Sequence, residues 1–459
     1  MALIKSISGI RGTIGGESGI NLSPLDVVRF TSAFAQYLSQ THKEKLTVVT
    51  GRDARVSGII IHNLVNQTLV SMGINVIDLG LSTTPTVALL VSKQSANGGI
   101  VLTASHNPKQ WNALKLLDEK GEFIDAKDGL QVLDYAAKES FKYASVEHLG
   151  KISIFNNAIE KHIKECMSLK YVQVDKIRKT SFKVVVDGVN SSGGIAIPAL
   201  LESLDIEVVK IHCEPNGEFP HNPEPLKEHL TDLCEAVLIH KADFGIAVDP
   251  DVDRLVFVDE KGELFGEEYT LVACADYVLG KNPGATVSNL SSTRALADVA
   301  NLHGQTYTAS AVGEVHVVAE MKKSKAVIGG EGNGGIIYPG SHYGRDALVG
   351  VVLFLSLLVE RKVSVSKLRA TYPNYYMSKN KINLKKGMDV DRILRDLGNH
   401  YSNEIITSID GLKIDFENSW VHLRKSNTEP IIRIYTEAKT QEEADTIAYR
   451  FDKEIKALF

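Results

Sequence analysis

The segment Phe244–Arg254 reads FGIAVDPDVDR and carries the clearest indication of the fold. Its first residues are small or apolar without alternation, a pattern typical of a strand that is buried on both faces of a parallel sheet. An acidic turn follows at once, so it lies at the carboxyl end of that strand, where open α/β sheets bind their ligands. The segment therefore predicts an α/β fold with a ligand site at this turn.

Strands and helices alternate on both sides of this segment. Upstream, strands are predicted at 46–50 and 74–79 with a helix at 60–72 between them, and a further buried strand is predicted at 182–187. Downstream, the apolar residues 326–328 predict another strand. Repeated βα units of this kind favour mostly parallel, doubly wound sheets with helices on both faces.

The end of the chain has a different pattern. Strands are predicted close together at 411–416, 419–423 and 431–437, followed by a helix at 441–458. Clustered strands with helices at the ends favour an α+β domain. The prediction is a multidomain α/β protein. Three doubly wound mixed α/β domains, at 1–150, 151–255 and 256–372, are followed by a smaller α+β C-terminal domain at 373–459.

Composition excludes several classes of protein. The 459 residues carry a net charge of −5, so no basic surplus exists for binding nucleic acid. The four cysteines lie far apart, without the spacing of a zinc site or a disulfide framework. The longest apolar stretch, 347–359, is shorter than the roughly 20 residues of a membrane span. We expect a cytoplasmic protein without a membrane partner, and the composition leaves its oligomeric state open.

The acidic turn has the residues of a metal site. Asp249, Asp251 and Asp253 alternate along it, so their carboxylates can converge on one hard cation such as Mg²⁺. Arg254 could hold a neighbouring phosphate. The alternative is a solvated acidic turn, although three like charges so close together repel one another without a cation.

A second polar turn, Thr103–Pro108, follows the apolar strand 98–102. Ser105 could act there as a nucleophile or phosphate carrier, with His106 orienting the phosphate and Lys115 supplying a cation. An ordinary loop with a helix cap is an equally good interpretation of this hexapeptide alone.

Three further segments could contact a ligand. In the glycine-dense loop 330–335, Glu331 and Asn333 could bind hydroxyl groups, although a structural turn explains the glycines as well. The segment 424–430 combines cations and hydroxyl groups that suit a phosphate, and its alternative is a basic surface turn. Arg11, between two glycines, could reach a phosphate or lie on a flexible arm.

Taken in this order and spacing, the five segments resemble the α-D-phosphohexomutase superfamily over essentially the whole chain. The resemblance implies four domains around a central cleft. It implies that Ser105 carries the transferable phosphate, flanked by His106 and Lys115, and that Arg11 lies near the reacting centre. By the same resemblance, Asp249, Asp251 and Asp253 hold Mg²⁺ together with the Ser105 phosphate, Glu331 and Asn333 bind the sugar, and Arg424, Ser426, Asn427 and Thr428 bind the non-reacting phosphate.

The reaction that the resemblance implies interconverts hexose 6-phosphate and hexose 1-phosphate. It passes through a phosphoserine and a bisphosphorylated hexose, which also serves as activator. The loop around Glu331, with Val312–Glu314 upstream, is most similar to phosphoglucosamine mutases, which favours glucosamine phosphate as substrate, towards UDP-N-acetylglucosamine. Glucose and mannose phosphates remain alternatives. Gly335 replaces a histidine that many relatives have, which leaves the general acid or base open.

Two other classes fit parts of the pattern. In a haloacid-dehalogenase-like phosphatase, Asp249 would be the nucleophile, and its aspartyl phosphate would be labile in base. A phosphate on Ser105 would survive acid. A non-catalytic sugar-phosphate sensor would need neither Ser105 as a phosphoryl donor nor three aspartates beside it.

Overall fold

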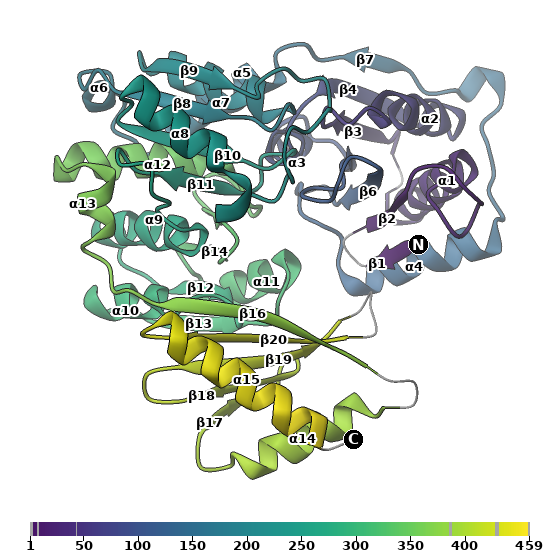
Figure 1. Ribbon diagram of the computed structural model, residues 1–459. Helices are drawn as coiled ribbons and strands as arrows, with labels where there is room; N and C mark the ends of the chain where they lie inside the picture. Colours follow the sequence, from purple (N-terminus) through teal and green to yellow (C-terminus); the bar gives the residue numbers. More distant parts are fainter. Residues whose placement is uncertain (1–2, 7–8, 43, 385–387, 427–430, 458–459) are drawn as a thin grey trace.

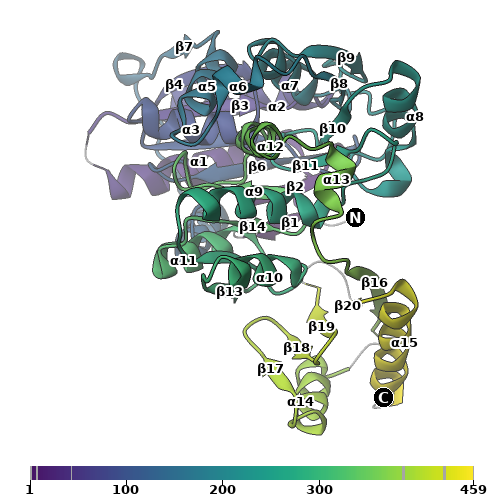
Figure 2. The same ribbon diagram turned by 90° about the vertical axis from the view of Figure 1, so that its left-hand side faces the viewer.

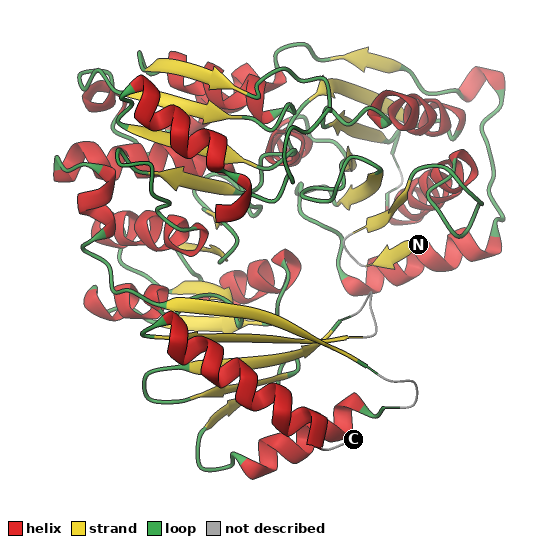
Figure 3. Cartoon of the chain, viewed as in Figure 1, coloured by secondary structure: helices red, strands yellow, loops and turns green. Residues whose placement is uncertain are grey.

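The structure is a computed structural model that describes residues 3–6, 9–42, 44–384, 388–426 and 431–457 (Figure 1). Within these residues the chain forms four sheets that follow one another along the sequence (Figure 3). The first three belong to α/β domains, and the fourth belongs to a smaller α+β domain. The predicted fold class is therefore confirmed.

The first domain contains β1 (Ile4–Ser6), β2 (Gly9–Thr13), α1 (Pro24–Thr41), β3 (Thr47–Arg52), α2 (Gly58–Ser71), β4 (Asn75–Leu81), α3 (Thr84–Lys93), β5 (Gly98–Leu102), β6 (Trp111–Leu117), α4 (Ala126–Lys138) and β7 (Ile152–Ile154). Its sheet has the order β1-β2-β6-β5-β3-β4-β7. Strand β3 is parallel to β4 and β5, and β6 returns antiparallel to β5. The loop that carries Ser105 joins β5 to β6, so it leaves the sheet at the carboxyl end of a parallel strand.

The second domain contains α5 (Ala158–Ser168), α6 (Val174–Ile177), β8 (Lys183–Asp187), α7 (Gly193–Glu202), β9 (Glu207–Ile211), α8 (Thr231–His240), β10 (Phe244–Val248) and β11 (Leu255–Val258). Its sheet has the order β11-β10-β8-β9. All of β10 is buried, as its apolar sequence predicts, and it is parallel to β8 and antiparallel to β11. The acidic turn therefore reverses the chain between two adjacent strands.

The third domain contains α9 (Glu267–Lys281), β12 (Thr286–Asn289), α10 (Ala295–Leu302), β13 (Tyr307–Ser310), α11 (Glu314–Ser324), β14 (Ile328–Glu331), β15 (Gly335–Ile337), α12 (Ala347–Arg361) and α13 (Val365–Arg369). Its sheet has the order β13-β12-β14-β15, with β12 parallel to β13 and β14.

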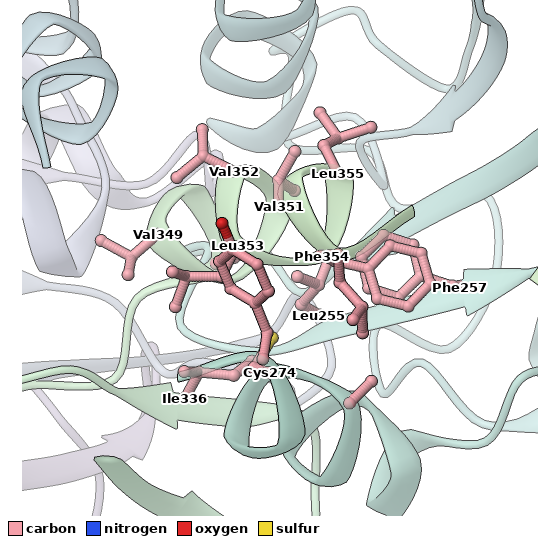
Figure 4. Close-up of a cluster of buried hydrophobic side chains, with 14 of the residues drawn as sticks. Leu255, Phe257, Cys274, Ile336, Val349, Val351, Val352, Leu353, Phe354 and Leu355 are labelled. Carbon is pink, nitrogen blue, oxygen red and sulfur yellow. The ribbon is translucent and has the colours of Figure 1, made fainter. Parts of the chain in front are cut away.

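Helix α12 is the longest apolar stretch of the sequence, and it lies in one hydrophobic core that the second and third domains share. Its residues from Ala347 to Val359 are all buried. The ring of Phe354 stacks on Phe257 of β11 with 3.7 Å between centroids, beside Leu255 and Cys274 (Figure 4). The second and third domains are thus packed around one helix. In the described part of the chain, no helix combines the length and apolarity that crossing a membrane requires.

The fourth domain contains β16 (Tyr376–Asn383), α14 (Val390–His400), β17 (Ile405–Thr407), β18 (Leu412–Asp415), β19 (Trp420–Lys425), β20 (Ile431–Ala438) and α15 (Gln441–Ala457). Its antiparallel sheet has the order β16-β20-β19-β18-β17. Strands β18 to β20 and helix α15 lie where the sequence predicts them. Strand β16 was not predicted, because most of its residues are polar and exposed. In both views this domain lies below the third domain and projects from the rest of the chain (Figure 2).

Candidate active site

The acidic turn between β10 and β11 gathers three carboxylates in one buried place. Oxygen atoms of Asp249, Asp251 and Asp253 lie within 4.8 Å of one another, and all three residues are fully buried. Among the described residues, no hydrogen-bond partner reaches Oδ1 of Asp251 or Oδ1 of Asp253. Unpaired buried carboxylate oxygens are costly, so this donor set fits a hard divalent cation such as Mg²⁺.

Two buried cations border the aspartates. The Lys115 ammonium donates to Asp251 Oδ2 at 2.6 Å and to Asp253 Oδ2 at 3.4 Å, and Arg345 Nη2 donates to Asp253 Oδ2 at 2.7 Å. Burial alone would raise the pKa of Asp251, but Lys115 lowers it below the usual range. Burial and the other two aspartates raise the pKa of Asp249 well above its usual value. The raised pKa of Asp249 reflects its burial and the crowding of three carboxylates, which a further cation would relieve.

Ser105 lies against this turn. Its buried hydroxyl donates to Asp249 Oδ2 at 2.8 Å and lies 3.4 Å from Nδ1 of His106. Burial, followed by Arg254 and Arg11, lowers the pKa of His106 well below its usual value, so the ring is neutral near pH 7. The φ angle of Ser105 is +50°, in the left-handed region that serine seldom adopts. Strain of this kind is concentrated at functional sites.

A buried arginine that the sequence analysis did not single out holds the serine loop in place. The guanidinium of Arg55 donates to four carbonyl oxygens of the loop, those of Ser105, Asn107, Pro108 and Trp111. Its Nε pairs with Asp53 Oδ2 at 3.0 Å. A planar group with several fixed donors thus determines the course of the loop that presents Ser105. The sequence signal for this role was the position of Arg55 shortly after strand β3, at the edge of the sheet where the serine loop also lies.

Two further arginines flank the serine loop from different domains. Arg11 of β2 donates to Asn107 Oδ1 at 2.7 Å. Arg254, directly after the acidic turn, donates to Glu224 Oε1 at 3.1 Å, and its buried Nε has no partner among the described residues. Both guanidinium groups act electrostatically on His106 and line the same cavity as Ser105, where positive charge suits a phosphate.

One cavity of about 880 Å³ is lined by residues of all four domains. The predicted site residues on its wall are Arg11, Ser105, His106 and Lys115 from the first domain, Arg254 from the second, Glu331 and Asn333 from the third, and Arg424 from the fourth. A cavity of this volume lies within the range of small-molecule sites. The chain therefore brings together segments that are more than 400 residues apart.

The glycine-dense loop supplies the third domain's part of this wall. Glu331 accepts hydrogen bonds from Asn289 Nδ2 at 2.8 Å and from the backbone N–H of Gly313 at 3.1 Å. Gly334 has a φ of +85°, and a Cβ there would lie 2.4 Å from the carbonyl oxygen of Leu255. The loop packs so closely on β11 that only glycine fits, which fixes Glu331 relative to the acidic turn.

Arg345 connects this loop with the acidic turn, and the sequence analysis missed it. Its buried guanidinium pairs with Asp253 at 2.7 Å, with Glu331 at 2.9 Å and with Glu314 at 2.9 Å. Burial would lower its pKa, but Asp253 and the two glutamates raise it well above the usual value. A permanently charged arginine therefore couples the acidic turn to the glycine-dense loop. A single arginine in a polar segment gives no local pattern that could reveal this.

The fourth domain adds a cationic surface. Arg424 of β19 and Arg433 of β20 line the cavity, as do Lys379 and Tyr435. The Nε atom of Arg424 lies 2.8 Å from Asp410 Oδ2. Ser426 follows β19 and is half-buried, whereas the predicted Asn427 and Thr428 fall outside the described residues. Arg433, Lys379 and Tyr435 are cavity residues that the predicted site did not include.

Four family models match the chain in sequence order. All describe phosphoglucomutase/phosphomannomutase: α/β/α domain I at residues 3–143, domain II at 160–262, domain III at 266–375 and the C-terminal domain at 379–454. Each match contains one of the cavity-lining segments described above.

Individual proteins agree over the full length. The phosphoglucomutase/phosphomannomutase of Thermococcus kodakarensis is 34% identical over 95% of this chain and 94% of its own. The phosphoglucosamine/phosphogalactosamine mutase of Sulfurisphaera tokodaii is 30% identical over 99% of both chains. A crystal structure of a family protein from Burkholderia thailandensis superposes with a TM-score of 0.84 at 24% identity, covering 99% of this chain and 98% of that one. This last likeness supports the fold alone.

Proposed function

The chain belongs to the phosphoglucomutase/phosphomannomutase family, and we propose that it interconverts hexose 6-phosphate and hexose 1-phosphate through a phosphoserine at Ser105. As a phosphohexomutase it is an isomerase that moves a phosphate within a sugar. The observation that carries the proposed role of Ser105 is its position: it lines a cavity that all four domains share, and its hydroxyl donates to Asp249 of the acidic turn.

The reaction balances in two transfers. In the first, the bond between Ser105 Oγ and phosphorus breaks as phosphorus bonds to a free hydroxyl oxygen of the bound sugar phosphate, and the hydroxyl proton ends on Ser105. In the second, the other phosphate returns to Ser105, and the sugar oxygen takes up the proton. The intermediate is a bisphosphorylated hexose, which as an added activator would also phosphorylate the free serine.

In each transfer, the protein supplies positive charge around the transferring phosphoryl group and holds the reacting groups in position. Lys115, Arg11 and Arg254 face the equatorial oxygens of the transferring group, where phosphoryl transfer needs positive charge. Mg²⁺ held by Asp249, Asp251, Asp253 and the Ser105 phosphate would add further charge neutralisation. Lys115 is kept protonated because, despite its burial, Asp251 and Asp253 raise its pKa, so it serves as a cation and not as a base.

The two ends of the substrate meet different walls. Glu331 and Asn333 are the proposed contacts for sugar hydroxyls. Arg424, Ser426, Asn427 and Thr428 are the proposed contacts for the phosphate that is not being transferred, and Arg433 lies beside Arg424. Because the sugar must present either end to Ser105, contacts to phosphate oxygens serve both orientations better than contacts to one face of the ring.

We propose glucosamine phosphate as the substrate. The third-domain wall carries the carboxylates of Glu268, Glu314 and Glu331, the last two paired with Arg345 of the same wall, and the fourth-domain wall carries cations. Opposed charges of this kind suit a ligand with an ammonium group and a phosphate. The relative from Sulfurisphaera acts, by its name, on amino sugars, whereas the name of the Thermococcus relative favours glucose and mannose phosphates as the alternative. Glucosamine 1-phosphate would serve the synthesis of UDP-N-acetylglucosamine.

The decisive experiment compares substrates on the purified protein. Glucosamine, glucose, mannose and N-acetylglucosamine phosphates are assayed side by side with Mg²⁺ and the matching bisphosphate. The highest kcat/KM is expected for glucosamine 6-phosphate, and a higher value for glucose or mannose would transfer the assignment to the alternative. Trapped phosphoenzyme should carry acid-stable phosphate on Ser105. Base-labile phosphate on Asp249 would instead identify phosphatase-like chemistry.

A further inference from the structure

Three buried side chains from three domains meet close to the metal-binding turn. His162 of α5 lies in the second domain, with Nδ1 2.9 Å from Thr86 Oγ1 in the first domain and Nε2 2.8 Å from Asp346 Oδ2 in the third. The three residues are at most 1% exposed. None of the reacting groups proposed above contacts His162 directly, so its role is not catalytic in the narrow sense.

The hydrogen bonds of this cluster run in one direction. Because a carboxylate only accepts, His162 Nε2 carries the proton and donates to Asp346. In the tautomer that carries its proton on Nε2, Nδ1 accepts from the Thr86 hydroxyl. Thr83 Oγ1, 2.7 Å from Thr86 Oγ1, donates in turn to Thr86.

His342 completes the cluster. Its Nε2 lies 3.0 Å from Asp346 Oδ2, and one ligand atom each of His162, His342 and Asp346 falls within 4.8 Å of the others. The contacts to Asp346 have the length of ordinary hydrogen bonds, and the same carboxylate oxygen accepts from both rings. We therefore interpret the cluster as a hydrogen-bond network, and a second metal site becomes an outcome that the test must detect.

One arm of the network reaches the metal-binding turn through the first domain. Thr86 stands in the first turn of α3, and the Thr83 side chain caps that helix by accepting from the Thr86 N–H at 3.1 Å. In the same turn, Thr84 Oγ1 donates to Asp251 Oδ2 at 2.5 Å, and the Thr84 N–H donates to the Asp251 carbonyl oxygen at 2.9 Å. The end of α3 therefore holds Asp251 by side chain and backbone together.

The other arm reaches the same turn through the third domain. Asp346 Oδ1 caps α12 by accepting from the N–H groups of Leu348 at 2.8 Å and Val349 at 3.2 Å. The two sequence neighbours of Asp346 contact the acidic turn. Arg345 donates to Asp253 Oδ2, and the Ala347 N–H donates to the Val252 carbonyl oxygen at 3.2 Å. Displacing Asp346 would thus move the groups that hold Asp253.

We propose that His162 is a positioning residue for the metal-binding turn, which sets the separation of Asp251 and Asp253 by joining the two domains that hold them. Hydrogen-bond partners behind a metal's ligands orient those ligands, and their loss typically weakens metal binding about 10- to 100-fold. The inference rests on the proposed metal site, and the experiment below lets the two fail separately.

The test is direct titration of the full chain with Mn²⁺, followed by electron paramagnetic resonance of the free ion, so that binding is measured without turnover. The variant is His162→Leu. The matched control is His62→Leu, because His62 is also buried and also contacts a threonine and an aspartate, at 3.2 Å from Thr50 Oγ1 and 3.2 Å from Asp78 Oδ1, all within the first domain. A purely structural loss would affect both variants alike.

The expected result is a Kd for Mn²⁺ raised by about 10-fold or more in His162→Leu, with His62→Leu within about 2-fold of the parent protein. If His162→Leu does not fold, Thr86→Val and Thr86→Ser decide, since only serine keeps the donor to Nδ1. Weaker binding by Thr86→Val than by Thr86→Ser supports the inference.

Four results would overturn the positioning role of His162 or the proposed metal site on which it rests. Parent-like Mn²⁺ binding in folded His162→Leu, or equal binding in the two Thr86 variants, would remove the positioning role alone. A parent protein that binds no Mn²⁺ would remove the proposed metal site itself. A hydrogen-bond network does not bind zinc, so zinc that copurifies with the parent protein and is lost from His162→Leu would show that the cluster of His162, His342 and Asp346 is a second metal site.

Discussion

Arg424 and Arg433 are direct cross-strand partners on β19 and β20, and both face the central cavity. Like charges directly opposite each other destabilise a sheet, so the pair costs stability unless an anion lies between them. Asp410 neutralises part of this charge from the side of Arg424, at 2.8 Å. The remaining positive charge is what a ligand's phosphate would find on the fourth-domain wall.

Replacing Arg424 should therefore weaken substrate binding without loss of stability. A charge-assisted contact to phosphate is worth roughly 1.5–3 kcal/mol, so Arg424→Ala should lower kcat/KM by about 10- to 150-fold. The contact is made in ground and transition states alike, so the change should appear mainly in KM. The control is Lys425→Ala, because the adjacent side chain is exposed and points to the other face. A normal KM in Arg424→Ala would make this segment a basic surface turn.

Two substitutions that remove the Ser105 hydroxyl should both abolish turnover, but the two variants should differ in stability. Ser105→Ala and Ser105→Gly both lose the proposed phosphate carrier. Glycine accepts the φ of +50° without strain, whereas alanine there costs roughly 1 kcal/mol, so Ser105→Gly should be the more stable variant by about that amount. Steady-state assays, intact-mass analysis and urea unfolding together measure these effects. Retained activity in either variant would end the assignment of Ser105.

Local patterns explain what the sequence could predict. The apolar run of β10 and the aspartates after it are adjacent in the chain, so both the buried strand and a candidate metal turn follow from one short segment. The same holds for Ser105, at the end of β5. Each of these features depends on neighbours in the sequence, and the parallel-sheet rule places each turn at the carboxyl end of a strand in its own sheet. Contacts between the two domains then bring the turns together.

Long-range partners explain what the sequence could not predict. Arg55 holds a loop some 50 residues away, and Arg345 joins carboxylates from three segments. His162 stands alone on an amphipathic helix, where a buried histidine has no distinguishing pattern. In the fourth domain, β16 lacks an apolar face long enough to mark it. These features depend on partners far away in the sequence, within one domain for Arg55 and between domains for Arg345 and His162.

Removing divalent metal should stop the reaction, and Mg²⁺ should restore it. Asp251→Asn removes one of the three charges at the turn, so it should raise the Mg²⁺ concentration for half-maximal activity by about 10-fold or more. The matched control is Asp243→Asn, an exposed aspartate before the opposite end of the same strand, which should leave the Mg²⁺ requirement unchanged. Full activity in excess chelator would contradict a metal role for the turn.

The contact between the third and fourth domains should weaken in mild acid. His422 is buried, with Nδ1 2.8 Å from Ser291 Oγ and Nε2 2.7 Å from the Asp410 carbonyl oxygen. Burial lowers its pKa from 6.5 to about 4, so the unfolded chain takes up a proton that the folded chain resists. The contribution of His422 to the free energy of unfolding should therefore not change with pH above pH 6.5. Below that pH it should fall by up to about 1.4 kcal/mol per pH unit down to about pH 4.

Trp420 fluorescence can measure this effect in the fourth domain. The chain has two tryptophans, so Trp111→Phe leaves Trp420 as the only reporter. In that background, the loss of stability between pH 7 and pH 5 should be smaller for His422→Gln than for the parent. His400→Gln is the control, because His400 is exposed in the same domain. An identical loss in His422→Gln and the parent would refute the role of this histidine.

Arg55 offers the sharpest test of loop positioning. Lysine keeps the positive charge beside Asp53 but has a single nitrogen, so it cannot hold four carbonyl oxygens at once. Arg55→Lys should therefore fold and let the Ser105 loop shift. A misplacement on the order of 1 Å lowers a phosphoryl-transfer rate by up to about 10²-fold, with the fall in kcat and little change in KM. Arg52→Lys is the matched control. Arg52 is the last residue of β3 and donates to the backbone carbonyl of Asp53 at 3.1 Å without touching the serine loop. Equal kcat values for Arg55→Lys and Arg52→Lys would show that the loop keeps its course without the guanidinium.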